Sequence, residues 1–370
     1  MTAKKAVLVL EDGSRFEGKA FGSGKSAAGE VVFNTGMVGY PESFTDPSYA
    51  GQILALTYPL IGNYGVPPQT RANGFSKYFE SERIQIAGLV VSGYSRDCSH
   101  WNATECLDDW LRRENIPAMA GIDTRALTQK LREKGVMLGK IVAGRDNVKL
   151  TDPNKRNLVA EVSCREPVVY GEGVAVDGNK PSGKAKKTVA LLDCGVKNNI
   201  IRSFLQRGVR VVRLPWNYNL FDSEYAFDGL FISNGPGDPK KCMATLELIR
   251  AALEKKMPTF GICLGNQLLA LAVGADTYKL KYGHRSQNQP CKLEGTRRCF
   301  ITAQNHGFAV DETTLPRDWK PWFTNLNDGT NEGIRHKSGK FFSVQFHPEA
   351  TPGPLDCGFL FDEFIKGLKK

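Results

Sequence analysis

A cysteine between two glycines, at the junction of an apolar strand-like segment and an apolar helical segment, is the clearest chemical signal in the sequence. Gly261 and Gly265 flank Cys263 in the pattern G-x-C-x-G, the form of a nucleophile elbow. Small neighbours allow a sharp turn on which the thiol stands clear, and the amides that begin the following helix favour the thiolate. A lone cysteine at a strand end is more often a small buried hydrophobe, so the elbow alone leaves both interpretations open.

A histidine and a glutamate near the C-terminus provide the partners that a thiol nucleophile needs. His347 follows an apolar strand-like segment, Glu349 lies two residues further on, and Pro348 restricts the backbone between them. We expect His347 to accept the thiol proton and later to donate it, and Glu349 to hold the imidazole and stabilise its charged form. An isolated His-Pro-Glu turn would be a solvated surface turn. The strand before it and the elbow elsewhere favour a catalytic triad.

A glycine-rich turn, SNGPGDP at 233–239, also follows an apolar strand-like segment. Two glycines around a proline leave backbone amides accessible, which suits a loop that holds a developing oxyanion. The alternative interpretation is an ordinary turn that ends a strand.

The elements that must position these turns alternate between strands and helices after residue 188. The strand-like segments TVALLDCG, VRVVRLP, GLFISNGPGDP and PTFGICLG are separated by helical stretches. This alternation is typical of βαβ units, so we predict an α/β fold with a doubly wound, mostly parallel sheet over 188–370. Ligands of such sheets bind at the carboxyl ends of the strands, which is where all three turns fall.

The sequence before residue 150 has shorter strand-like segments and two helical stretches. In the second stretch, Asp123 or Thr124 is a plausible N-cap and Gly135 a plausible stop. We therefore predict an N-terminal mixed α/β domain over 1–150. The segment GEGVAVDGNKPSGKAKKT lacks hydrophobic periodicity, so we place a linker at 151–187.

Composition narrows the classes of protein further. Hydrophobic residues make up 41% of the chain and charged residues 24%, and no apolar run is long enough to span a bilayer. Nine cysteines without a CxxC pair indicate reduced thiols in the cytoplasm, and dispersed histidines predict no metal site. The net charge of +10 is spread along the chain, which predicts an acidic protein partner rather than nucleic acid.

With SNGPGDP, FGICLGNQLLALA and FSVQFHPEA in this order, the second region resembles the class I, triad-type glutamine amidotransferases. The whole chain resembles the small, glutamine-hydrolysing subunit of carbamoyl phosphate synthetase. That resemblance extends to residues 29–65, to GIDTRALTQKLREKG and to TAQNHGFAV. It therefore covers nearly the full length.

The resemblance implies a catalytic role for Cys263, His347 and Glu349. It implies glutamine contacts by a set of residues from both regions: Ser48, Gly235, Gly237, Leu264, Gln267, Asn305, Gly307 and Phe308. Backbone amides of Gly237 and Leu264 would form the oxyanion hole, and Ser48 would bring the first domain into the glutamine site. Asn266 departs from the histidine that many class I members have after the elbow glycine, which leaves only the positioning of the elbow helix in doubt.

The resemblance also implies what the reaction is for. The chain would hydrolyse glutamine and pass the ammonia to a large subunit that makes carbamoyl phosphate from bicarbonate and two ATP, for arginine and pyrimidine biosynthesis. We expect no cofactor in this chain, with ATP and magnesium on the partner, in a cytoplasmic heterodimer or a higher oligomer. The end of the sequence, just after an amphipathic helical stretch, favours a free subunit. The alternatives are a hydrolase of the same fold that acts without a partner, and a non-catalytic module that regulates a synthetase.

Overall fold

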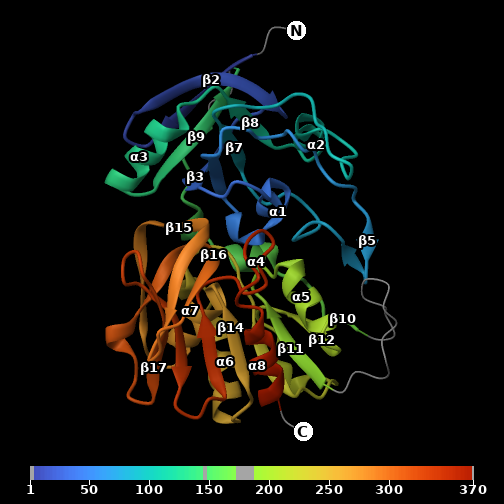
Figure 1. Cartoon of the computed structure of the whole chain (residues 1–370), viewed down its shortest axis with the longest axis vertical. Helices are drawn as coiled ribbons and strands as arrows, with labels where there is room; N and C mark the ends of the chain where they lie inside the picture. Colours follow the sequence, from blue (N-terminus) through green and yellow to red (C-terminus); the bar gives the residue numbers. More distant parts are fainter. Residues whose placement is uncertain (1–3, 145–147, 172–186, 369–370) are drawn as a thin grey trace. The chain divides into compact units, whose positions relative to one another are not determined.

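The computed structural model describes residues 4–144, 148–171 and 187–368, which form two compact units (Figure 1). The first unit comprises residues 1–70, 76–156 and 281–285. The second unit comprises residues 71–75, 157–280 and 286–370.

The first unit is built on a closed barrel of seven strands, in the order β1-β2-β8-β7-β4-β3-β9. The pairs β3–β4, β4–β7 and β7–β8 are parallel, and the other four are antiparallel. The strands are β1 (Lys5–Leu10), β2 (Arg15–Gly22), β3 (Ala27–Asn34), β4 (Gln52–Leu56), β7 (Gly88–Val91), β8 (Pro117–Ala120) and β9 (Met137–Ala143).

Apolar side chains fill the barrel, as expected where alternate residues of small-barrel strands point inward. Leu8, Val31, Ile53 and Met119 belong to this buried cluster. Position 139 on β9 needs a glycine, because a Cβ there would lie 2.4 Å from a methyl group of Val31.

Short helices accompany the barrel, and the two predicted helical stretches coincide with two of them. Asp123 caps α3 by accepting a hydrogen bond from the amide of Ala126 at 2.9 Å, and Gly135 ends the helix with φ 102°, so the predicted cap and stop are confirmed. The remaining elements before residue 157 are α1 (Tyr40–Thr45), η1 (Pro47–Tyr49), β5 (Arg71–Ala72), β6 (Phe75–Ser76), α2 (Leu107–Arg113), α3 (Thr124–Lys134) and η2 (Pro153–Lys155).

The second unit contains most of a ten-stranded sheet in the order β10-β12-β11-β13-β14-β19-β18-β17-β15-β16. Its central pairs, from β12–β11 to β14–β19, are parallel. The strands are β10 (Val168–Tyr170), β11 (Lys187–Asp193), β12 (Val209–Pro215), β13 (Gly229–Ile232), β14 (Thr259–Ile262), β15 (Asp276–Leu293), β16 (Cys299–Asp311), β17 (Trp319–Asn325), β18 (Asn331–His336) and β19 (Phe341–Val344). The helices and 3-10 turns are α4 (Leu158–Val162), α5 (Asn198–Leu205), η3 (Leu220–Asp222), η4 (Pro239–Lys241), α6 (Met243–Glu254), α7 (Leu264–Ala272), η5 (Glu312–Thr314) and α8 (Phe359–Gly367).

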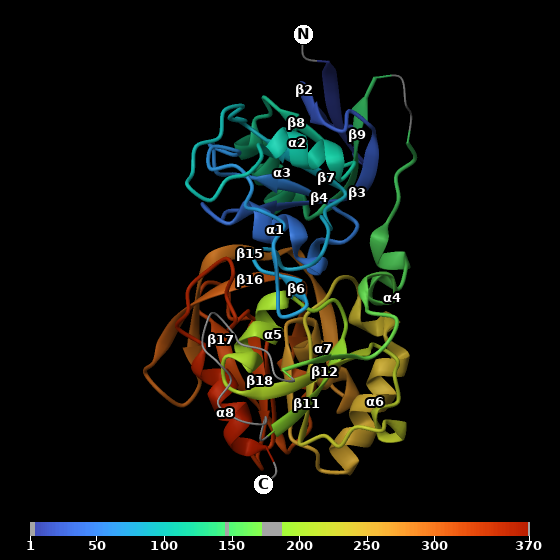
Figure 2. The ribbon, with the colours of Figure 1, turned by 90° about the vertical axis from the view of Figure 1, so that its right-hand side faces the viewer.

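Both faces of the parallel strands are covered, which explains their continuous apolar runs. In β11, Val189 and Leu191 face a cluster with α5 and α8, whereas Ala190 and Leu192 face a cluster with α6 and α7. Figure 2 shows α8 and α6 on opposite sides of the strands. The predicted α/β class with a doubly wound, largely parallel sheet is therefore confirmed. The closure of the N-terminal sheet into a barrel was not predicted.

The range predicted as a linker, 151–187, contains η2, α4 and β10 in its described part. Most of the segment that lacks periodicity, residues 172–186, lies outside the described residues. The helices described in the structure include none that is long and apolar enough to cross a membrane.

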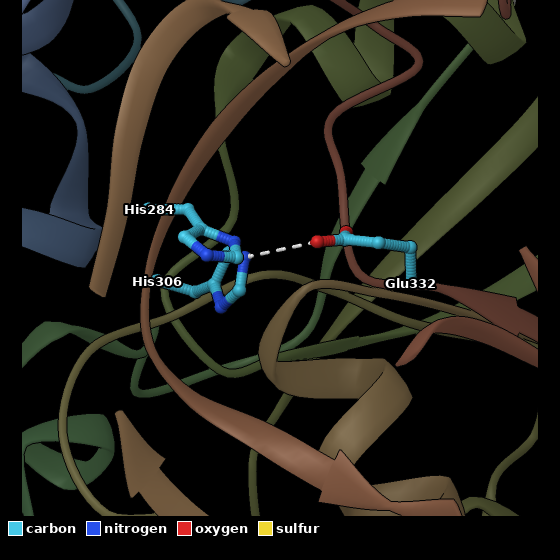
Figure 3. A group of neighbouring side chains, drawn as sticks. All are labelled: His284, His306 and Glu332. Carbon is cyan, nitrogen blue, oxygen red and sulfur yellow. Dashed lines mark ion pairs between the residues drawn. The ribbon is translucent and has the colours of Figure 1, made fainter. Parts of the chain in front are cut away.

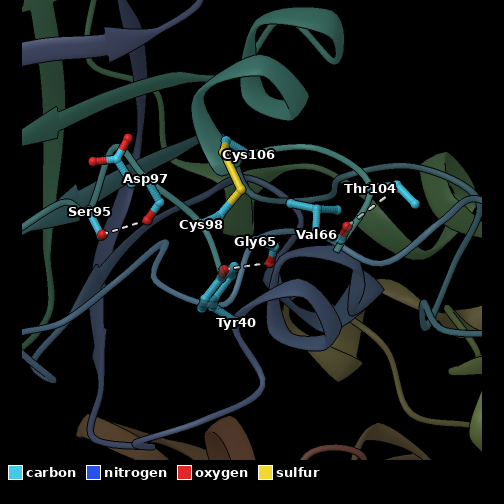
Figure 4. Close-up of a disulfide and its surroundings, with 8 residues drawn as sticks. All are labelled: Tyr40, Gly65, Val66, Ser95, Asp97, Cys98, Thr104 and Cys106. Atoms are coloured by element: carbon cyan, nitrogen blue, oxygen red, sulfur yellow. Dashed lines mark hydrogen bonds between the residues drawn. A yellow bond between two sulfur atoms is a disulfide. The ribbon is translucent and has the colours of Figure 1, made fainter. Parts of the chain in front are cut away.

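The expectation of reduced thiols is wrong for one pair of cysteines. Cys98 and Cys106 form a disulfide, with their Cα atoms 5.7 Å apart (Figure 4). Backbone hydrogen bonds fold the connecting loop back, because the amide of Thr104 donates to the carbonyl oxygen of Val66 and the amide of Val66 donates to that of Glu105, each at 2.9 Å. The other seven cysteines are free thiols.

Candidate active site

Cys263 lies at a sharp turn between β14 and α7, as the elbow pattern predicts. Its backbone has φ 56° and ψ −105°, a strained conformation for a residue with a side chain. The neighbouring glycines allow the close packing that holds this turn. A Cβ at Gly261 would lie 2.5 Å from the carbonyl oxygen of Gly265, and a Cβ at Gly265 would lie 2.3 Å from that of Ile232. The amide of Cys263 donates to the carbonyl oxygen of Val344 at 2.8 Å, which fixes the elbow to the end of β19.

His347 and Glu349 follow directly from β19, the strand next to the one that leads into the elbow. The backbone amide of His347 donates to the carbonyl oxygen of Ala303 at 2.9 Å. Its Nδ1 lies 2.6 Å from Oε1 of Glu349, so that nitrogen carries the proton and donates it to the carboxylate. This hydrogen bond leaves Nε2 as the ring nitrogen that is not bound to Glu349.

The thiol of Cys263 lies beside this histidine but points at a different acceptor. Its Sγ is 3.6 Å from the carbonyl oxygen of Asn305, and the described residues offer no hydrogen-bond partner to Nε2 of His347. The interaction between thiol and imidazole nevertheless contributes to the pKa of His347.

Neighbouring buried charges determine the protonation states of His347 and Glu349. Burial alone would lower the pKa of His347, but the carboxylate of Glu349 and the neighbouring Cys263 raise it well above its usual value. Burial would raise the pKa of Glu349, yet Lys197 and His347 lower it to about 2. Glu349 is thus a carboxylate at neutral pH, and His347 is a stronger base than an ordinary imidazole.

Lys197 is the residue of this site that the sequence did not reveal. It precedes α5, and its Nζ lies 3.1 Å from Oε1 of Glu349 and 2.6 Å from the carbonyl oxygen of Ala350. The amide of Lys197 donates to Oδ1 of Asn234 at 3.1 Å, which ties it to the glycine-rich loop. The only feature of the sequence that could have indicated this role is the position of the lysine in the turn after an apolar strand. Its role depends on the order of the strands, which the sequence does not state.

The glycine-rich loop follows β13 and packs against the end of β11. The amide of Cys194 donates to Oγ of Ser233 at 2.9 Å. A Cβ at Gly235 would lie 1.9 Å from the carbonyl oxygen of Cys194, so this position admits only glycine. Gly237 has φ 85°, which also favours glycine.

The remaining predicted glutamine contacts lie on β16 and α7 of the second unit, except for Ser48, which belongs to the first unit. Gln267 and Phe308 lie together, since Nε2 of Gln267 donates to the carbonyl oxygen of Phe308 at 2.9 Å, and Asn305 contacts the thiol. Gly307 lies between Asn305 and Phe308 on β16, and Leu264 begins α7, where its amide has no partner within the helix. Ser48 lies in η1 of the first unit, where its amide donates to Oδ1 of Asp46 at 2.9 Å. The binding roles of all these residues stay predictions.

A buried histidine and glutamate lie on strands of the same sheet. Nε2 of His306 on β16 is 3.8 Å from Oε1 of Glu332 on β18; Figure 3 draws both together with His284 of β15. His306 also contacts the carbonyl oxygen of Phe308 through Nδ1 at 2.8 Å. The expectation that the chain holds no metal stays a prediction.

The parallel sheet, the elbow and the row of Cys263, His347 and Glu349 together define a glutamine amidotransferase of the triad class. The family profile described as glutamine amidotransferase class-I matches residues 190–367. The profile described as carbamoyl-phosphate synthase small chain, CPSase domain, matches residues 8–141.

One relative of similar length is the carbamoyl phosphate synthase arginine-specific small chain of Saccharomyces cerevisiae. It is 51% identical over 376 residues, which cover 100% of this chain and 90% of the yeast chain. The chain therefore belongs to the family of carbamoyl phosphate synthase small chains, and the resemblance inferred from its motifs is confirmed.

Two further relatives are much longer proteins. The multifunctional protein CAD of Squalus acanthias is 56% identical over 98% of this chain, which spans 16% of that protein. The human mitochondrial carbamoyl-phosphate synthase [ammonia] is 50% identical over 100% of this chain, which spans 24% of that protein. The same pair of regions thus occurs in relatives of very different length.

Proposed function

We propose that the chain hydrolyses the side-chain amide of glutamine to glutamate and ammonia, and supplies the ammonia to a synthetase that makes carbamoyl phosphate from bicarbonate and ATP. The observation that carries this proposal is the contact of His347 with Glu349 at 2.6 Å beside the strained elbow of Cys263. The membership of the small-chain family supports the same activity.

In the first half of the proposed reaction, the Cys263 thiol gives its proton to Nε2 of His347 and the sulfur attacks the carboxamide carbon of glutamine. The negative oxygen of the tetrahedral intermediate accepts hydrogen bonds from the amides of Gly237 and Leu264. The carbon–nitrogen bond then breaks, the nitrogen takes the proton from His347, and ammonia leaves a γ-glutamyl thioester. The raised pKa of His347 favours the protonated form that this step uses.

In the second half, His347 accepts a proton from water while the water oxygen attacks the thioester carbon. The carbon–sulfur bond breaks, the sulfur regains the proton from His347, and glutamate is released. Glu349 remains ionised throughout, because its pKa is about 2. It holds the imidazole in one orientation in both halves.

We assign the binding of glutamine to the residues that the family resemblance names. They are Ser48, Gly235, Gly237, Leu264, Gln267, Asn305, Gly307 and Phe308. The missing Cβ of Gly235 lets this loop pack against the carbonyl oxygen of Cys194, and the carbonyl oxygen of Asn305 lies near the reacting sulfur.

A synthetase partner follows from the chemistry of ammonia. At neutral pH, free ammonia is mostly ammonium, which is not a nucleophile, so a protected route to the second active site is needed. We place ATP and magnesium on that partner and no cofactor on this chain, in a heterodimer or a higher oligomer. The name of the yeast relative, an arginine-specific small chain, supports a place in arginine biosynthesis, and we propose pyrimidine biosynthesis as the other use of the product. We also propose a cytoplasmic location, although the Cys98–Cys106 disulfide removes part of the argument from reduced thiols.

The test is a complex of this chain with a synthetase large subunit, assayed with glutamine and with ammonium chloride. Cys263→Ser should abolish carbamoyl phosphate formation from glutamine and leave formation from ammonia intact. Unchanged use of glutamine would refute the triad. High glutaminase activity of the isolated chain, with no stimulation by the partner, would instead support a hydrolase that acts alone.

A further inference from the structure

A set of buried amide side chains connects the elbow helix to the segment that carries the catalytic base. Oε1 of Gln345 accepts two hydrogen bonds from α7, one from Nδ2 of Asn266 and one from Nε2 of Gln267, each at 3.2 Å. Oδ1 of Asn266 in turn accepts a hydrogen bond from Oγ of Ser343 at 2.8 Å. Gln345, Asn266 and Ser343 have no exposed surface, and Gln267 is 3% exposed.

The two ends of this connection are the two halves of the catalytic pair. Asn266 and Gln267 are the third and fourth residues after the nucleophile Cys263, and Gln345 is two residues before the base His347. The backbone amide of Gln345 also donates to the carbonyl oxygen of Glu332 at 2.9 Å, so its own position is fixed by the neighbouring strand β18. A shift of α7 along β19 would break both hydrogen bonds to Oε1.

We propose that Gln345 is a positioning residue, which sets the distance between the Cys263 thiol and the His347 imidazole by holding Asn266 and Gln267 of the elbow helix. This proposal rests on the proposed glutaminase function. The second hydrogen of the Gln267 amide is used at the same time, because Nε2 also donates to the carbonyl oxygen of Phe308. Gln345 therefore holds a helix that is also attached to the strand of the predicted glutamine contacts.

The arrangement accounts for asparagine at position 266, where many class I members have histidine. The amide of Asn266 is both donor and acceptor on a short side chain, since Nδ2 donates to Gln345 and Oδ1 accepts from Ser343. Hydrophobic residues of the same size would pack here without fixing the direction of α7. Small displacements of reacting groups have large effects on rate, since an error of about 1 Å can cost about 100-fold.

The experiment uses the complex with the synthetase subunit and compares Gln345→Met with the unaltered chain. Methionine keeps the length of the side chain and removes the acceptor Oε1. The amide nitrogen that it also removes has no hydrogen-bond partner among the described residues. We expect kcat for glutamine to fall roughly 10-fold to 100-fold while KM changes by less than about 3-fold. Carbamoyl phosphate formation from ammonia should not change.

A double-variant cycle tests whether Gln345 and Asn266 act through the same connection. Asn266→Leu should lower kcat about as much as Gln345→Met, and the double variant should be little worse than either single variant. Additive losses would overturn the proposal. The rate at which iodoacetamide alkylates Cys263 in the isolated chain should fall in the same variants, and this measurement requires neither the partner nor turnover.

Asn331→Leu is the matched control for the loss of a buried amide in the same sheet. Asn331 is 2% exposed, and its amide contacts Glu312 and the amide of Gly333 without a side-chain hydrogen bond to Gln345 or Asn266 among the described residues. It should lower the melting temperature and leave kcat and alkylation unchanged. If Gln345→Met behaves like this control, Gln345 is only structural and the proposal is wrong. If Cys263→Ser still uses glutamine, the proposed function has failed instead.

Discussion

Replacement of Lys197 by methionine tests how much the buried ion pair with Glu349 contributes to the stability of the fold. The side chains of Lys197 and Glu349 are 4% and 0% exposed, and Nζ lies 3.1 Å from Oε1. Removing one partner of a buried ion pair costs about 3–5 kcal/mol, because the remaining charge is left without compensation. The carbonyl oxygen of Ala350 also loses a hydrogen bond of 2.6 Å, although the hydrophobic stem of methionine replaces the packing of lysine. We therefore expect Lys197→Met to lower the free energy of unfolding by about 3–5 kcal/mol at pH 7.

Urea unfolding followed by tryptophan fluorescence measures this loss, and Lys240→Met provides the control. Lys240 pairs with Asp276 at 2.6 Å in the same unit, but these side chains are 51% and 58% exposed, so its removal should change stability far less than the removal of Lys197. Glutamine turnover should fall in Lys197→Met, because Glu349 loses the cation that lowers its pKa most and that holds the oxygen bonded to His347. A loss in Lys197→Met no larger than in Lys240→Met, with unchanged turnover, would refute the reasoning.

Three further outcomes follow from the structure. Gly265→Ala should lower the free energy of unfolding by about 1–3 kcal/mol and abolish most glutaminase activity, because the new Cβ would lie 2.3 Å from a carbonyl oxygen. Gly367→Ala in α8 is the control, since its Cβ would meet nothing within 4 Å, and thermal unfolding should find it neutral or stabilising. Thiol titration of protein denatured without reductant should find seven thiols, and nine after reduction, if Cys98 and Cys106 are paired; nine without reductant would contradict the disulfide. The ionised Glu349 contributes its full stability at pH values above its ordinary pKa of 4.5, and this contribution is lost as the pH falls toward the folded-state pKa of about 2. Between these two pH values, the urea midpoint should therefore drop more in the unaltered chain than in Glu349→Gln.

The parts of the site that could be predicted are those specified by local sequence. The turn at Cys263 needs glycines on both sides within two residues, and the contact of His347 with Glu349 needs only a rigid turn, so both are visible in short motifs. The alternation of apolar segments with helical ones gave the parallel sheet. The carboxyl ends of the strands then placed the three turns at one edge.

The features that escaped prediction depend on contacts between distant segments. Lys197 reaches Glu349 across 152 positions because β11, β13, β14 and β19 are neighbours in that order, an arrangement that no local pattern specifies. The barrel closes because β1 pairs with β9, and the cysteines of the disulfide meet because the loop between them returns to Val66. In each case, the pairing is decided by the fold as a whole, and the residues involved have no distinctive spacing.

The geometry of Glu349 indicates what its negative charge contributes. Its Oε1 receives both Nδ1 of His347 at 2.6 Å and Nζ of Lys197 at 3.1 Å, whereas Oε2 has no hydrogen-bond partner among the described residues. One carboxylate oxygen therefore contacts both side chains, and Lys197 keeps that carboxylate ionised because its charge lowers the pKa of Glu349. Two donors that converge on one atom fix its position better than a single donor, and His347 is held by the result. Lys197 thus supports the base in two ways, because it keeps Glu349 ionised and holds the oxygen that orients His347, which suits a histidine that must both accept and return a proton in each turnover.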